Sequence, residues 1–215
     1  MKIGVFDSGL GGLSVANAVR KALPEHEILF YNDHEHVPYG TKTKEELLSL
    51  SLPLLKQMQS VGCQVIVIAC NTLTTNVIDQ LRAKLQVPLV AVEPMVKPAV
   101  DLSESKVIAV CATPATLSST RYQELKRLYA SGVTVIQPNC SNWAELIEKR
   151  KMDQKQIKSM VSSVLSHGAD VIVLGCTHYH WIEQDIKNLA ADRAKVIQPE
   201  EAIIRELKLT LKQLA

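Results

Sequence analysis

Two stretches of this chain are near copies of each other, and each contains a cysteine near its end. Residues 62–72 read GCQVIVIACNT and residues 168–178 read GADVIVLGCTH. Each stretch passes from a glycine through four branched apolar residues into small polar ones, a pattern typical of a buried parallel strand and its carboxyl edge. In open α/β sheets, ligands bind in the crevice beyond such strand ends. The repeat therefore places Cys70 and Cys176 at equivalent positions beside a candidate site.

The two copies lie 106 residues apart, and a weaker pair supports the same division of the chain. The segment IGVFDS at residues 3–8 resembles IAVCAT at residues 108–113, at an offset of 105. Such a repeat predicts an internal duplication, in which two α/β domains related by an approximate twofold axis turn their strand ends toward one cleft. Cys70 and Cys176 would then approach a ligand from opposite sides. The expected domains are residues 1–97 plus 199–215 and residues 98–198.

Strand-length apolar segments alternate with segments of helical periodicity along most of the chain. The expected strands are Ile3–Phe6, Glu27–Tyr31, Val65–Ala69, Leu89–Val92, Val107–Cys111, Val133–Gln137, Val171–Gly175 and Lys195–Ile197. The expected helices are Leu13–Ala22, Lys44–Val61, Asn76–Leu85, Thr116–Ser131, Trp143–Lys149, Asp153–His167, Trp181–Ala190 and Glu200–Leu214. This alternation predicts an α/β fold with mostly parallel sheets flanked by helices. We expect the last helix to pack back on the first domain.

The composition narrows the class of protein. A chain of 215 residues buries roughly seven tenths of its unfolded surface, so it needs no disulfide or metal to fold. It is 47% apolar and 21% charged with a net charge of +2, which indicates a soluble globular protein without a nucleic-acid or membrane surface. The five cysteines are an odd number, and Met1 and Lys2 run directly into a strand without a secretory leader. We therefore expect free thiols and a cytoplasmic protein.

The two repeated cysteines are the leading candidates for chemistry. Each lies where a strand passes into a helix, so the helix dipole and nearby donors would favour the thiolate. A single cysteine at a strand end is more often a small core residue, but two at duplicated positions favour a functional role. Of the others, Cys63 and Cys111 read as core residues, whereas Cys140 follows a strand and could approach the cleft.

A glycine-rich segment, Asp7-Ser8-Gly9-Leu10-Gly11-Gly12, follows the first strand. It lacks the sixth-position glycine of dinucleotide loops and the Lys-Ser/Thr of phosphate loops. Its backbone N–H groups would suit a generic anion site for a carboxylate. A tight strand-to-helix turn without a ligand is an equally good interpretation.

Two other kinds of site compete with a pair of reactive thiols. The histidines near Cys176 and the pair His34 and His36 could bind a metal, but no Cys-x-x-Cys or His-Glu-x-x-His pattern is present. We therefore predict no metal. A hydrolase in which His178 activates one thiol would leave the second, equivalent cysteine without a role.

The chain resembles the cofactor-independent glutamate racemases of the aspartate/glutamate racemase superfamily over nearly its whole length. The matching segments are residues 4–14, 37–42, 69–72, 93–94 and 174–179. The resemblance implies two α/β domains with L- or D-glutamate bound between them and no cofactor. It also implies supply of D-glutamate for peptidoglycan and leaves a homodimer possible.

The resemblance also implies roles for particular residues. The thiol of Cys70 would take the α-proton from the D-enantiomer and that of Cys176 from the L-enantiomer. Asp7 and His178 would assist proton transfer, with Glu148 in a supporting role. The implied substrate site consists of Asp7, Ser8, Pro38, Tyr39, Gly40, Asn71, Thr72, Thr113, Thr116, Thr177 and His178.

Some positions depart from the family pattern. The chain is shorter in its second half, and Cys140-Ser141 replaces the usual Cys-Pro. His34, His36 and His180 also differ from most members. A racemase of aspartate or another amino acid, or a catalytically weak amino-acid-binding member, therefore remains an alternative.

Overall fold

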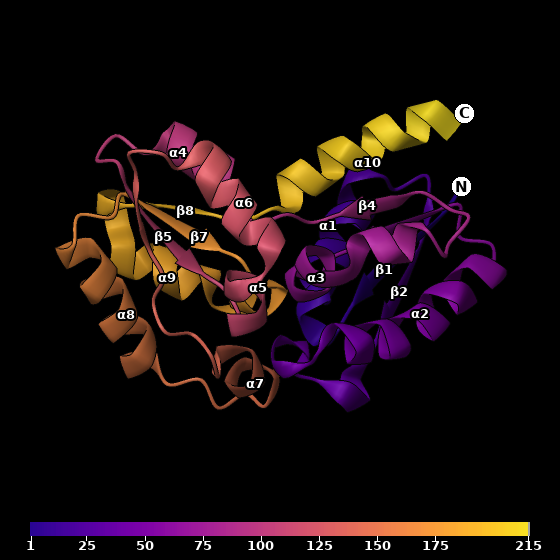
Figure 1. Cartoon of the computed structure of the whole chain (residues 1–215), viewed down its shortest axis with the longest axis horizontal. Coiled ribbons are helices and arrows are strands. Elements are labelled where there is room, and N and C mark those ends of the chain that lie inside the picture. The colour runs from indigo at the N-terminus through magenta and orange to yellow at the C-terminus, as the bar shows by residue number, and fades with distance from the viewer. Residues whose placement is uncertain (215) are drawn as a thin grey trace.

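The computed structural model describes residues 1–214, which form two four-stranded parallel sheets (Figure 1). The first sheet contains β1 (Lys2–Asp7), β2 (Glu27–Asn32), β3 (Val65–Ile68) and β4 (Leu89–Ala91). The second contains β5 (Val107–Cys111), β6 (Thr134–Ile136), β7 (Val171–Leu174) and β8 (Lys195–Ile197). The predicted α/β architecture is confirmed, and all eight strands lie where the apolar runs placed them.

The strand orders of the two sheets match. The first runs β2-β1-β3-β4 and the second β6-β5-β7-β8. The central pairs also share a register, since Ile3 lies opposite Val65 in the first sheet and Ile108 opposite Val171 in the second. The sheets are therefore two copies of one arrangement, as the sequence repeat predicts.

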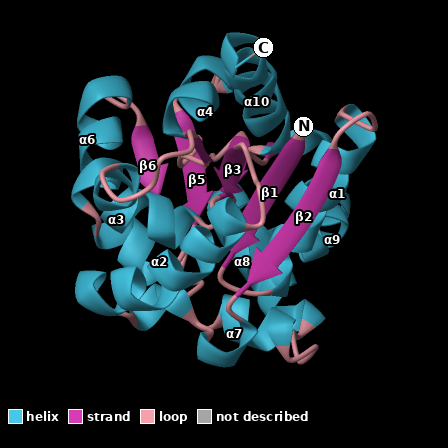
Figure 2. Cartoon of the chain, turned by 90° about the vertical axis from the view of Figure 1, so that its right-hand side faces the viewer, coloured by secondary structure: helices cyan, strands magenta, loops and turns pink. Residues whose placement is uncertain are grey.

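Helices cover both faces of each sheet, as Figure 2 shows for the first. The α-helices are α1 (Leu13–Ala22), α2 (Lys44–Ser60), α3 (Asn71–Arg82), α4 (Val96–Leu102), α5 (Pro114–Ser118), α6 (Thr120–Tyr129), α7 (Trp143–Glu148), α8 (Gln154–Ser166), α9 (Glu183–Ala190) and α10 (Glu200–Leu214). Short 3-10 turns are η1 (Leu10–Gly12), η2 (His34–His36), η3 (Tyr39–Thr41), η4 (Thr177–Ile182) and η5 (Ala191–Arg193). Because β3 and β7 are completely buried, the central strands read as continuous apolar runs.

Three helical segments differ most from the sequence prediction. Helix α3 begins at Asn71, five residues before the expected start, with Cys70 at its N-cap. The helix expected from Thr116 is divided in two at Ser119, whose side chain caps α6 through the Tyr122 N–H. Helix α4 lies outside the predicted helices; its Pro98 is in the first turn, where proline is tolerated.

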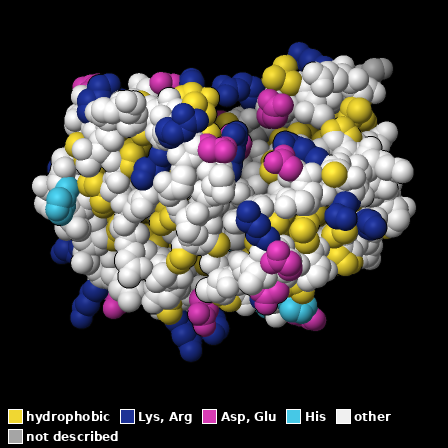
Figure 3. Space-filling model, viewed as in Figure 1, with side chains coloured by type: hydrophobic (Ala, Val, Ile, Leu, Met, Phe, Trp, Pro, Cys, Tyr) yellow, Lys and Arg dark blue, Asp and Glu magenta, His cyan; other side chains and the backbone are white. Residues whose placement is uncertain are grey.

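The C-terminal helix α10 returns to the first sheet (yellow in Figure 1). Its Ile203, Leu207 and Leu211 are buried in a cluster with residues of α1 and the first sheet. The exact domain boundaries, near residues 97 and 199, stay a prediction. No helix within residues 1–214 is long and apolar enough to cross a membrane. Figure 3 shows basic and acidic side chains interspersed over one face.

Candidate active site

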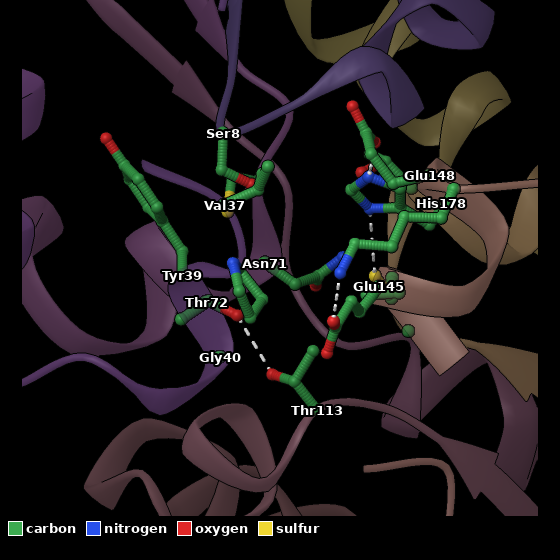
Figure 4. Close-up of a pocket in the computed structure, with 17 residues that line it drawn as sticks. Ser8, Val37, Tyr39, Gly40, Asn71, Thr72, Thr113, Glu145, Glu148 and His178 are labelled. Carbon is green, nitrogen blue, oxygen red and sulfur yellow. Dashed lines mark hydrogen bonds and ion pairs between the residues drawn. The ribbon is translucent and has the colours of Figure 1, made fainter. Parts of the chain in front are cut away.

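A cavity of about 90 Å³ lies between the carboxyl ends of the two sheets. One water molecule needs roughly 10–15 Å³ of such space, so a ligand with several non-hydrogen atoms can fit. The residues that line it are Ser8, Val37, Pro38, Tyr39, Gly40, Cys70, Asn71, Thr72, Thr113, Ala144, Glu145, Glu148, Lys149, Gly175, Cys176, Thr177 and His178 (Figure 4).

Most of the residues predicted for the site line this cavity. Ser8 and Thr113 follow the equivalent strands β1 and β5, and Cys70 and Cys176 follow the equivalent strands β3 and β7. Asp7 and Thr116 do not line the cavity. Both are fully buried, and each is bonded to a residue that does.

Cys70 is buried at the start of α3, with its Sγ 3.5 Å from the Ser8 hydroxyl oxygen. Burial and the nearby Asp7 carboxylate raise the pKa of this thiol to about 12. The expectation that the helix terminus would favour a thiolate is therefore wrong for Cys70. The cost of placing a charged thiolate away from water outweighs the stabilisation by the helix dipole, so this thiol stays protonated near neutral pH.

Cys176 has a different neighbourhood. Its Sγ lies 3.7 Å from Nδ1 of His178, whose Nε2 contacts a carboxylate oxygen of Glu148. Burial alone would lower the pKa of His178, but hydrogen bonds with Cys176 and Glu148 raise it to about 11. The imidazole is therefore a cation at neutral pH, and this charge lies beside the Cys176 thiol group.

Glu148 connects the two halves of the molecule. It is carried by α7 of the second half, and its carboxylate accepts the Leu10 N–H of the first half at 3.2 and 3.3 Å. Burial alone would raise the pKa of Glu148, but the hydrogen bond with His178 and the other contacts lower it. The carboxylate therefore stays charged and holds α7 against the glycine-rich turn.

Asp7 lies beneath the cavity floor. Its Oδ2 accepts the N–H groups of Gly9 at 3.1 Å and Gly12 at 3.0 Å, and its Oδ1 accepts the Thr177 hydroxyl at 3.1 Å. Burial raises the pKa of this carboxyl, although the His178 charge and these donors oppose the rise. The Asp7 carboxyl group thus connects the two halves and fixes the position of the Thr177 hydroxyl.

The N–H groups of the glycine-rich turn are used by carboxylates of the protein itself. Gly9 and Gly12 bind Asp7, and Leu10 binds Glu148, so the predicted anion site does not open to a ligand here. Gly11 has no room for a side chain, since a Cβ there would lie 2.6 Å from the backbone nitrogen of His178. The absence of a side chain at Gly11 therefore allows the glycine-rich turn to pack directly against the second half.

Threonine side chains join the halves on the opposite side of the cavity. The hydroxyl oxygens of Thr72 and Thr113 are 2.9 Å apart (Figure 4). The Thr113 hydroxyl also donates to that of Thr116 at 3.0 Å. The amide of Asn71 is buried in the cavity wall, and neither of its polar atoms has a hydrogen-bond partner among residues 1–214. Because an unpaired buried amide is costly, this group is available to a ligand.

Comparison with known proteins identifies the family. The sequence profile of the Asp/Glu/Hydantoin racemase family matches residues 13–207. The chain belongs to this family. The predicted resemblance is thereby confirmed: the chain is a cofactor-independent racemase, a kind of isomerase.

Several relatives cover nearly the whole chain. It is 38% identical to the glutamate racemase of Methylococcus capsulatus over 213 residues, 97% of this chain and 79% of that protein. The glutamate racemase of Ralstonia pickettii is also 38% identical, over 97% of this chain and 76% of that protein. Among solved structures, Escherichia coli glutamate racemase in complex with L-glutamate and the activator UDP-MurNAc-Ala gives a TM-score of 0.90 at 27% identity, covering 98% of this chain and 82% of that one.

Five lining residues of this racemase were not predicted: Val37, Ala144, Glu145, Lys149 and Gly175. Val37 and Gly175 adjoin predicted residues, so the motifs themselves could have indicated them. Ala144, Glu145 and Lys149 lie on or next to α7, and no local pattern shows that this helix reaches the cavity. Lys149 Nζ pairs with Glu145 Oε1 at 2.5 Å.

The other candidate groups of this racemase have partners elsewhere. Cys140 is buried with Cys111 in the core of the second half and is not among the residues that line the cavity, so the expectation that it could approach the cleft is wrong. His36 binds Asp33 at 2.6 Å, and His180 contacts the Ser14 hydroxyl at 3.0 Å. Within residues 1–214, no group of three or more potential ligands is arranged to hold a metal ion.

Proposed function

We propose that the chain is a glutamate racemase that interconverts L- and D-glutamate by proton transfer between two thiols. One observation carries the proposal: Cys70 and Cys176 follow equivalent strands of two copies of one fold and line the same cavity. Inversion at an α-carbon requires proton removal on one face and proton delivery on the other. A pair of groups related by an approximate twofold axis meets that requirement.

The surroundings of the thiols favour one resting state. Cys70 holds its proton, because its pKa is raised to about 12, and Cys176 lies beside the His178 cation. In this state, the thiolate of Cys176 removes the α-proton of the L-enantiomer and the thiol of Cys70 protonates the other face. The reverse protonation state serves the D-enantiomer. The assignment of enantiomers to thiols follows the family resemblance.

The carbanionic intermediate needs stabilisation that this chain can supply by preorganised donors. Deprotonation places negative charge on the α-carbon and the α-carboxylate. The unpaired Asn71 amide and the hydroxyls of Thr72 and Thr177 line the cavity and would donate to that carboxylate. Ser8, Tyr39 and Gly40 would complete the substrate site, with Asp7 and Thr116 holding Thr177 and Thr113 from behind.

The choice of a dicarboxylic substrate is supported by Lys149. Among the lining residues it is the one lysine or arginine, and it pairs with the half-exposed Glu145. A side-chain carboxylate of the substrate would replace Glu145 as its partner. Lys149→Met should raise the KM for glutamate about fivefold, since one partly exposed ion pair contributes about 1 kcal/mol. Inhibition by glutamine should not change, and Lys151→Met, a change of an exposed lysine outside the cavity, is the matched control.

Racemisation assays without added cofactor test the proposed reaction. L-glutamate, D-glutamate and both enantiomers of aspartate would be followed by polarimetry with the wild type, Cys70→Ser and Cys176→Ser. Racemisation of glutamate that both variants lose supports the proposal. Faster racemisation of aspartate would contradict the substrate assignment. Binding of glutamate without racemisation would point instead to a catalytically weak binding member of the family.

The biological setting follows from the same proposal. A glutamate racemase in the cytoplasm would supply D-glutamate for peptidoglycan synthesis and so contribute to cell wall biogenesis and cell shape. We also propose that the domains divide near residues 97 and 199, and that a homodimer forms. Light scattering of the purified protein checks the oligomeric state.

A further inference from the structure

The 3-10 turn η4, which follows Cys176, is bonded to the first half at two side chains. The Thr177 hydroxyl donates to Asp7 Oδ1 at 3.1 Å, and His180 Nδ1 lies 3.0 Å from the Ser14 hydroxyl oxygen. A 3-10 helix has three residues per turn, so side chains three positions apart point the same way. Thr177 and His180 therefore share the face of η4 that is turned toward the first half.

In the chain, His178 lies between these two bonded residues, and it has other partners. Its imidazole contacts Glu148 and the Cys176 thiol (Figure 4). Its backbone nitrogen lies against Gly11, where no side chain fits. The place of this imidazole relative to the first half, which carries Cys70, therefore depends on how η4 is held there.

The neighbours of His180 place a proton on its Nδ1. The Ser14 hydroxyl donates to the Gly11 carbonyl at 3.2 Å, so its oxygen is left to accept a hydrogen bond from the imidazole. Glu200 Oε1 lies 3.4 Å from the same Nδ1. The hydrogen bond with His180 lowers the pKa of Glu200, although partial burial opposes this, so the carboxylate is charged and can only accept. The Nδ1–H group of His180 therefore donates toward two acceptors.

These three side chains join three separate elements outside the cavity. Ser14 is on α1, His180 is on η4, and Glu200 begins α10 beside the predicted domain boundary at residue 199. The His180 side chain is only 2% exposed, and its Nε2 has no hydrogen-bond partner among residues 1–214. An unpaired buried nitrogen costs folding free energy, which the contacts of Nδ1 must offset. Because His180 does not line the cavity, it acts on the site through η4.

We propose that His180 is a positioning residue, which holds η4 against α1 and α10 so that Cys176 and His178 keep their places relative to Cys70. This inference rests on the proposed function, since it concerns the same pair of thiols. Without the hydrogen bonds of Nδ1, η4 would shift against the first half, and a displacement of about 1 Å can slow a reaction by up to about 10²-fold. The loss would fall on proton transfer at Cys176, because Cys70 belongs to the first half and does not move with η4.

Four variants isolate the hydrogen bond of His180. His180→Leu removes the donor, whereas His180→Asn keeps an N–H donor near the position of Nδ1. Ser14→Ala removes one acceptor with a smaller change in packing, so it tests the same bond if His180→Leu folds poorly. His167→Leu, the same substitution at an exposed histidine of the second half, is the matched control. Circular dichroism would first show which variants are folded.

The α-deuterium isotope effect on kcat/KM, measured from each enantiomer of glutamate, separates positioning from a general loss of structure. Poorer transfer at Cys176 makes that step more rate-limiting in both directions. The isotope effect should therefore rise for the enantiomer that Cys176 deprotonates and fall for the other. His178→Gln changes a group that contacts Cys176 directly, so it gives the reference direction of this shift.

We expect His180→Leu to lower kcat/KM about tenfold and to shift the two isotope effects in the same direction as His178→Gln. Ser14→Ala should shift them in that direction too, and the double variant should be no slower than His180→Leu, because both changes break one bond. His180→Asn and His167→Leu should match the wild type. Unshifted isotope effects in His180→Leu and Ser14→Ala, or a His180→Asn as slow as His180→Leu, would overturn the inference while leaving an active racemase. An inactive wild type would instead reject the proposed function.

Discussion

The two halves place equivalent cysteines in opposite electrostatic surroundings. Two residues after Cys176 stands His178, and two residues after Cys70 stands Thr72. The first half has Asp7 where the second half has Ala112, so this nearby carboxylate adds to the effect of burial in raising the pKa of Cys70. The imidazolium adjoins Cys176 instead. The duplication has kept the strand ends in place, while the neighbouring side chains give the two thiols different electrostatic surroundings.

The largest expected difference between the halves is in thiol reactivity. With a pKa of about 12, Cys70 is ionised in about one molecule in 10⁵ at pH 7, whereas Cys176 faces a cation. Iodoacetamide should therefore alkylate Cys176 at least about 10²-fold faster than Cys70 in the absence of substrate. Peptide mass spectrometry over time measures both rates, and equal rates would contradict the assigned resting state.

Removal of the cation should produce the next largest effect. His178→Gln keeps a polar side chain but loses the charge beside Cys176, and we expect kcat/KM to fall about 10²-fold. The fall must be equal for the two enantiomers, since their equilibrium constant is 1. Steady-state assays in both directions check this result, and wild-type activity would show that His178 does not act on the thiol.

The same histidine makes stability depend on pH. Because folding raises the pKa of His178 from 6.5 to about 11, its contribution to stability is complete below pH 6.5 and is lost as pH rises toward 11. Between pH 7 and 8.5, the Tm of the wild type should therefore decline more steeply than that of His178→Gln. Calorimetry across this range measures both slopes, and parallel slopes would exclude a protonated His178 in the folded protein.

A smaller effect is expected on the threonine side of the cavity. Thr72→Val retains the shape of the side chain but breaks its hydrogen bond to Thr113 across the two halves. Unfolding free energy should fall by about 1 kcal/mol, the usual net contribution of such a bond. Urea denaturation measures the change, and Thr210→Val, whose hydroxyl bonds to the Glu206 carbonyl of the same helix, serves as the control.

The fold was largely predictable because its central strands are buried on both faces. Such strands read as uninterrupted branched apolar runs, and the repeat then pairs them between halves. The start of α3 was not predictable in this way. Asn71, Thr72, Thr74 and Thr75 are polar yet buried, the first two in the wall of the cavity, and this breaks the apolar periodicity.

The cavity residues that could not be predicted are those whose positions depend on contacts between distant parts of the chain. Residues at strand ends could be found from local patterns, since strands fix their positions. The contact of Glu148 with Leu10 joins residues 138 positions apart, and nothing local to α7 indicates that Glu145 and Lys149 line the cavity. The raised pKa of Cys70 likewise depends on burial in the assembled fold.

The most direct test of two-thiol catalysis is the position of deuterium after early turnover of L-glutamate in deuterium oxide. Transfer between opposite thiols predicts that the D-glutamate formed carries deuterium at its α-carbon, while the remaining L-glutamate keeps its α-proton. Starting from D-glutamate should give the mirror result. Product that retains the substrate proton, or equal deuteration of both enantiomers from the outset, would indicate a single base and contradict the paired roles of Cys70 and Cys176.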